Sequence, residues 1–146
     1  MTTEQPGLFG QSSIAQDDAR LIDAYRDAGR TLDDLPHTPE FDRLTEQLRA
    51  AGDTRSAHEI YRRLHNLRKA SKLPALGLRS TGAFKLEPEH ETLLIETVES
   101  MHGPISTRDQ LPHTPAMAAI VERFNAESGL ALDAHAVWRV IAKLAK

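Results

Sequence analysis

The sequence predicts an all-α protein made of two tandem three-helix bundles joined by a linker. Two observations carry this prediction: the pentapeptide LPHTP occurs at 35–39 and again at 111–115, and apolar residues recur at helical spacing around both copies. No segment shows the sustained alternation of a strand. We expect a flexible N-terminal tail (1–15), a first repeat (16–73), a basic linker (74–86) and a second repeat (87–146).

A second match supports the duplication. The segment 57–64 aligns with 134–141 at an offset of 77, whereas the two pentapeptides are 76 positions apart. Two matches in the same order indicate one unit of roughly 55 residues present twice. The sequence leaves open whether the two copies pack together or move separately.

Each helix of the first copy has its own start and stop signals. The first is expected over 17–28, with Gly29 as its stop. The second begins with Thr38 as N-cap and Pro39 at the first helical position, and Gly52 ends it. Their apolar stripes consist of Leu21, Ile22 and Tyr25 in the first helix and Phe41, Leu44 and Leu48 in the second.

The third helix opens with a capping box, in which Ser56 and Glu59 satisfy each other's backbone amides. Its expected buried face consists of Ala57, Ile60, Tyr61, Leu64 and Leu67. The second copy repeats the plan, with Thr114 and Asp133 as N-cap candidates. Its three helices are expected over Pro88–Met101, Pro115–Ala126 and from Asp133 to about Ala145.

The net charge of −3 conceals a strongly basic segment. Residues 55–85 carry eight Lys and Arg against one acid, Glu59, a net of +7. The flanking segments, 1–54 and 86–146, have net charges of −6 and −4. Because salt limits a charge's reach to about 8 Å, a local basic surface decides polyanion binding more than the total does.

On a helical wheel of the third helix, the face opposite the apolar one carries Arg55, His58, Arg62, His65, Asn66 and Lys69. Arginine and asparagine can read guanine and adenine edges, and lysine neutralises phosphate. We expect Arg62 and Asn66 at base edges. Phosphate contacts are expected at Arg55, Lys69 and Lys72, and Arg63, Arg68, Arg79 and Lys85 could extend them along the backbone. The predicted DNA-binding residues are Arg55, His58, Arg62, Arg63, His65, Asn66, Lys69, Lys72, Arg79 and Lys85. The alternative is an ordinary solvated helix face.

The third helix of the second copy carries fewer cations. A secondary contact with DNA or with a protein partner is expected at His135, Arg139, Lys143 and Lys146. For a protein partner, Leu132 and Val140 would help form an exposed apolar patch. Trp138 is expected in the core, because its counterpart Tyr61 lies on the apolar side.

The sequence contains no motif of a catalytic site or a metal site. The chain has no cysteine, which excludes disulfides, thiolate metal sites and a cysteine nucleophile. No phosphate-binding loop, nucleophile elbow or metal-ligand spacing occurs. His37 and His113 are interpreted as structural, and Asp33 and Asp34 as ordinary loop acids. We expect no enzyme activity, no cofactor and no metal.

The N-terminal stretch lacks the charge and apolar pattern of a secretory signal, and no apolar run is long enough for a membrane span. We therefore expect no membrane partner. The expected location is the cytoplasm, in association with the nucleoid, of a prokaryote or a phage-infected cell.

A tandem of three-helix units with a basic third helix resembles the Myb/SANT-like repeat family. The acidic pair at 17–18, Leu21 and Gly29 have the spacing of that family's first helix. The third-helix pattern is matched by Arg55, Ser56, Ile60, Arg63 and Asn66. The family's three spaced tryptophans are absent, with Ser13 and Leu64 at two of those positions. A bacterial helix-turn-helix unit shares these features.

The resemblance implies a helix-turn-helix type of fold and insertion of the first copy's third helix in the major groove of double-stranded DNA. The expected role is transcriptional regulation or maintenance of a phage or mobile-element genome. The alternative is a non-enzymatic adaptor whose two helical repeats bind acidic and apolar surfaces of other proteins. The sequence leaves the DNA target and the oligomeric state open.

Overall fold

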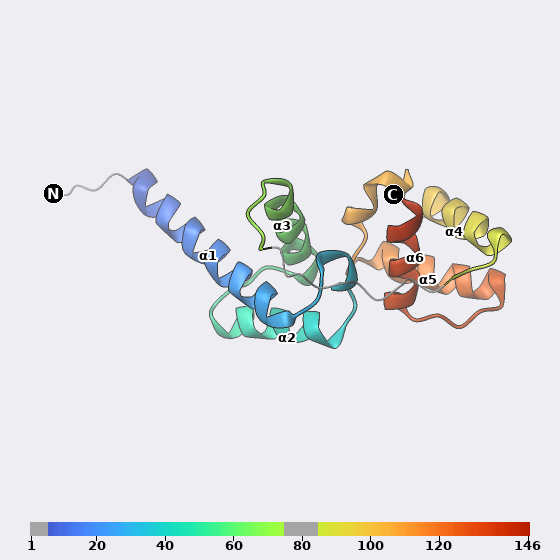
Figure 1. Ribbon diagram of the computed structural model, residues 1–146, viewed down its shortest axis with the longest axis horizontal. Coiled ribbons are helices and arrows are strands. Elements are labelled where there is room, and N and C mark those ends of the chain that lie inside the picture. The colour runs from blue at the N-terminus through green and yellow to red at the C-terminus, as the bar shows by residue number, and fades with distance from the viewer. Residues whose placement is uncertain (1–5, 75–84) are drawn as a thin grey trace.

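The first half of the chain folds into three α-helices and one short 3₁₀ turn. A computed structural model of the protein describes residues 6–74, with side chains from residue 16 onward, and residues 85–146. We call these two ranges the first half and the second half. The first contains α1 (Pro6–Ala28), the turn η1 (Leu32–Asp34), α2 (Pro39–Ala50) and α3 (Ala57–Lys69) (Figure 1).

The second half repeats this order of elements. It contains α4 (Pro88–Met101), the turn η2 (Ile105–Gln110), α5 (Pro115–Ser128) and α6 (Ala134–Leu144). Figure 1 shows α1 reaching out to one end of the molecule and α4, α5 and α6 gathered at the other, with α3 between them. The described residues contain no strand, so the prediction of an all-helical protein is confirmed.

The helix starts lie where the capping signals predict them. The Thr38 hydroxyl accepts a hydrogen bond from the Phe41 amide at 3.1 Å, and Thr114 caps α5 in the same way. The capping box of α3 is complete, because the Ser56 amide donates to Glu59 Oε1 at 2.9 Å and the Glu59 amide donates to Ser56 Oγ. These bonds satisfy amides that a helix start leaves without partners.

Two bounds differ from the sequence prediction. Helix α1 begins at Pro6, so residues 6–15, expected in a flexible tail, are helical. Proline suits the first turn of a helix, and no other proline interrupts the segment that follows. Helix α5 continues two residues beyond the expected Ala126, to Ser128, and stops at Gly129, whose φ of 77° ends a helix without strain.

The two LPHTP elements have the same conformation. His37 and His113 both have a φ of 64°, in the left-handed region. The following threonines share φ −113° and ψ 158° to 159°, and each hydroxyl donates to the carbonyl three residues earlier. The duplication seen in the sequence therefore has a structural counterpart at this turn.

Matching residues of the two halves meet at the centre of the molecule. Helix α3 packs against η2, and α6 packs against η1. The rings of Tyr61 and Trp138 meet edge to face at 6.0 Å between centroids, and those of His37 and His113 stack at 4.2 Å. Contacts between equivalent residues are typical of a two-fold arrangement. The two halves therefore pack with approximate two-fold symmetry.

The histidine pair is uncharged at neutral pH. Burial lowers the pKa of His37 to about 4 and that of His113 to about 3. In the unfolded chain a histidine titrates near pH 6.5, so the unfolded state takes up the proton first as the pH falls. The stability that depends on the neutral rings is present above about pH 6.5 and is lost between pH 6.5 and pH 3–4.

We predict that the free energy of unfolding falls by at least ~2 kcal/mol between pH 7 and pH 4, since each shifted pKa unit corresponds to about 1.4 kcal/mol. Replacing both rings (His37→Asn with His113→Asn) should flatten this dependence, because asparagine does not titrate and tolerates a positive φ. Urea unfolding followed by Trp138 fluorescence measures the slope. His90→Asn is the control and should keep the wild-type slope; an unchanged slope in the double variant would contradict the assignment.

Candidate nucleic-acid interface

Helix α3 is buried on two sides, not on one. The expected apolar face is confirmed, with Ile60, Tyr61, Leu64 and Leu67 each no more than 1% exposed. His65, expected on the outward face, is only 8% exposed, so that part of the prediction is wrong. The physical reason is the packing of η2 from the second half against α3.

Two of the expected DNA contacts are paired within the first half. Arg55 binds the Asp53 carboxylate through Nε and Nη2, with Nη2 at 2.6 Å from Oδ2. Arg63 binds the Asp18 carboxylate in the same two-pronged way, with Nη2 at 2.7 Å from Oδ2. These hydrogen bonds hold the pKa of both carboxyl groups below the usual range. Neither arginine is a free cation of the surface.

Three further expected contacts face the second half. His58 Nδ1 lies 3.2 Å from the Pro112 carbonyl oxygen, which can only accept a hydrogen bond. Arg62 Nε and His65 Nδ1 lie 3.8 Å and 3.7 Å from Asp109 Oδ2, and neither nitrogen has a hydrogen-bond partner among the described residues. Burial also lowers the pKa of His65. Arg62, the expected base reader, is thus turned toward η2.

The carboxyl-terminal end of α3 is the open part of the predicted surface. Asn66, Lys69 and Lys72 are exposed, as is Lys85. Within the described part of the chain, these lysines form no ion pair with a carboxylate. Arg68 lies beside them, with Nη1 at 3.5 Å from Asp33 Oδ1. Arg79 lies outside the described residues.

The secondary set, which lies on α6 and just beyond its end, divides into an inner and an outer pair. His135 Nε2 and Arg139 Nη1 lie 3.0 Å and 2.7 Å from Asp34 Oδ1, at the contact with η1. Lys143 is exposed. Lys146 Nζ lies 3.4 Å from Asp33 Oδ2, with 66% of its side chain exposed. The inner pair connects the halves, and the outer pair faces solvent.

The expected apolar patch is not on the surface. Val140 is 1% exposed, which makes that prediction wrong, and Leu132 is half-buried. Asn125 holds Leu132 in place by bonding both its amide and its carbonyl. Trp138 lies in the core as expected, and its Nε1 donates to the Asp33 carbonyl at 2.9 Å.

The residue that sequence reasoning missed is Asp34. It is 5% exposed and binds Arg139 and His135 of the second half, while its other oxygen accepts from Arg30 Nη1 at 2.8 Å. A signal was available, because Asp34 and Asp109 both lie within two residues of an LPHTP element. Acids placed shortly before both copies of a duplicated element indicate a repeated contact, although Gln110 and not Asp109 stands at the position of Asp34.

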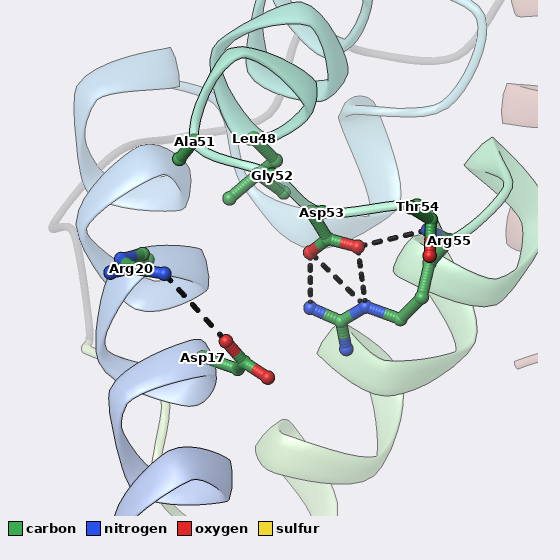
Figure 2. A pocket seen from close by; sticks show the side chains of 8 residues that line it. All are labelled: Asp17, Arg20, Leu48, Ala51, Gly52, Asp53, Thr54 and Arg55. Atoms are coloured by element: carbon green, nitrogen blue, oxygen red, sulfur yellow. Dashed lines mark hydrogen bonds and ion pairs between the residues drawn. The ribbon is translucent and has the colours of Figure 1, made fainter.

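A shallow pocket lies between α1 and the loop that joins α2 to α3 (Figure 2). Its volume is about 250 Å³, and its charged lining consists of Asp17, Arg20, Asp53 and Arg55. Figure 2 shows these groups paired as acid and base, Asp17 with Arg20 and Asp53 with Arg55. The pairing leaves no excess charge in the pocket to attract an ion.

No family model, no curated protein and no solved structure matches this chain. In the described part of the chain, no helix is long and apolar enough to cross a membrane, and no three His, Asp or Glu side chains come together as a metal site would require. The geometry of the chain itself is therefore the basis for a functional proposal.

We predict that Asp34→Ala lowers the free energy of unfolding by ~3 kcal/mol, because removing one member of a buried ion pair leaves the other charge uncompensated. Urea unfolding followed by Trp138 fluorescence measures the change, since Trp138 lies at the same contact. Asp27→Ala, which removes an exposed carboxylate of α1, is the control. A loss below about 0.5 kcal/mol, the range typical of surface substitutions, would show that Asp34 does not hold the halves together.

Proposed function

We propose that this protein binds double-stranded DNA through the carboxyl-terminal end of α3. The observation that supports this proposal is the exposed group of Asn66, Lys69 and Lys72, which lies on or just beyond the last turns of one helix. The major groove, about 12 Å wide, admits an α-helix. In this arrangement α3 enters the groove by its end, while Arg62 and His58 maintain the contact with the second half.

The side-chain types suit two different tasks. Lysine neutralises phosphate as a point charge, and asparagine can donate to and accept from an adenine edge. Lys69 and Lys72 would therefore position the helix on the backbone, and Asn66 would supply sequence preference. Lys85, at the other end of the linker, would extend the phosphate contacts. The resemblance to Myb/SANT-like repeats and helix-turn-helix units agrees with this reading of a three-helix unit with a basic last helix.

The role that follows is regulation of transcription, or maintenance of a phage or mobile-element genome. The alternative, an adaptor that binds other proteins, relied on an exposed apolar patch at Leu132 and Val140. Since Val140 is buried, that surface lacks the feature that favoured an adaptor. The DNA proposal is therefore the better supported of the two.

A salt titration of duplex binding tests the proposal. If three phosphates are neutralised, the affinity should fall roughly 40-fold between about 50 and 200 mM salt. Lys69→Glu should weaken binding at least tenfold at low salt, because it replaces a favourable contact by repulsion. Arg49→Glu makes the same charge change on α2, where Arg49 is exposed, and should have a much smaller effect. Absence of any binding at about 50 mM salt would rule the proposal out.

Asn66→Ala tests base reading separately. We expect a loss of about 1–3 kcal/mol on the preferred sequence and little change on unrelated duplexes, because one bidentate base contact is removed. Selection from a random duplex pool, carried out with both proteins, measures the change in preference. Equal weakening on all sequences would instead make Asn66 a backbone contact.

A further inference from the structure

We propose that the DNA-binding surface is composite, so that the carboxyl-terminal ends of α3 and α6 form one continuous basic surface across the two halves. This inference rests on the proposed function and names the second part of the same site. We call it the composite surface; its members are Arg68 and Lys69 of α3, Lys143 of α6, and Lys146 at the C-terminal end of the chain.

One carboxylate marks the place where the two helix ends meet. Arg68 Nη1 lies 3.5 Å from Asp33 Oδ1, and Lys146 Nζ lies 3.4 Å from Asp33 Oδ2. The two cations come from segments that are 78 residues apart in the sequence, yet they share one acidic group. The side chains of Arg68 and Lys146 are 41% and 66% exposed, so both still face solvent.

Two neighbouring lysines add to the positive charge of this surface. Lys69 follows Arg68 directly and is exposed. Lys143 lies in the last turn of α6 and is exposed as well, and its carbonyl accepts a hydrogen bond from the Lys146 amide at 3.3 Å, just beyond the helix end. Among the described residues, Lys69 and Lys143 have no carboxylate partner. Two cations thus contact Asp33, and two further exposed lysines lie on the same two segments, so positive charge exceeds negative charge among these residues.

The first half holds α6 firmly in this position, through η1. Trp138 Nε1 donates to the carbonyl of Asp33 itself, at 2.9 Å. One residue further along η1, the buried Asp34 carboxylate binds Arg139 and His135. These bonds fix the start and middle of α6 against η1, so the position of its carboxyl-terminal lysines does not depend on DNA. A preformed surface avoids an ordering cost on binding.

DNA is the occupant that this surface fits. Duplex DNA carries one negative charge per 1.7 Å of axis, so a cluster of cations can meet several phosphates at once. The Asp33 carboxylate occupies a position between Arg68 and Lys146, where a phosphate would satisfy the same two groups. Asp33 therefore orders the two cations in the free protein and competes with phosphate for them.

Charge reversal on α6 tests the composite surface. Lys143→Glu and Lys146→Glu should each weaken duplex binding about as much as Lys69→Glu, and each should reduce the salt slope by about 1. The control is Arg123→Glu, an exposed charge reversal on α5, with helicity and Trp138 fluorescence confirming that every variant folds. If wild type binds with the expected salt dependence and both α6 variants bind like wild type, the composite surface is wrong while the proposed function stands.

If wild-type protein shows no salt-dependent binding to any duplex, the proposed function fails, and the composite surface fails with it. A gain-of-function variant provides an independent test. Asp33→Asn should tighten binding about three- to tenfold at low salt, because it removes the acid that pairs with Arg68 and Lys146. Asp42→Asn, which neutralises an exposed acid of α2, should have a smaller effect. Unchanged or weaker binding by Asp33→Asn would overturn the role given to Asp33.

Discussion

The structure depends on a reciprocal contact, in which the third helix of each half packs on the short 3₁₀ turn of the other. The centre of this contact is the buried carboxylate of Asp34, with Arg139 at 2.7 Å. A buried charge is tolerated only when it is paired and hydrogen-bonded. Trp138 donates to the carbonyl of the adjacent Asp33, so the same short turn holds both the ion pair and the buried indole of α6.

The two sides of this contact, α6 on η1 and α3 on η2, are not equivalent. Arg139 is 12% exposed and bonds directly to Asp34, whereas the equivalent Arg62 is 36% exposed and lies 3.8 Å from Asp109. The acids are not at equivalent positions, because Gln110 stands where the first copy has Asp34. As a result, the contact with α6 is short and largely buried, and the contact with α3 is looser. The looser side is the one that carries most of the exposed cations.

Local features of the fold could be predicted from the sequence, and the contact between the halves could not. Caps such as Thr38 and the Ser56–Glu59 box involve neighbours within one turn, so their residue types are sufficient evidence. The outward placement of His65 failed because a helical wheel assumes one buried face. A second buried face needs a partner from elsewhere in the chain. A hint existed in α6, where Val140, Ile141 and Ala142 are three consecutive buried residues, more than a one-sided helix would have.

Counting charges along the sequence also overestimated the exposed basic surface. The reason is that arginine and lysine have different roles in this protein. Arginine, with its planar fork, suits carboxylates at internal contacts. In this protein Arg62, Arg63 and Arg139 face Asp109, Asp18 and Asp34. Acids from the flanking segments therefore offset much of the basic block. The lysines remain outside, and a compact, strongly hydrated ammonium binds phosphate without reading sequence. For the proposed DNA binding, a surface built mainly from lysines with Asn66 beside them implies an affinity that depends strongly on salt and only modestly on sequence.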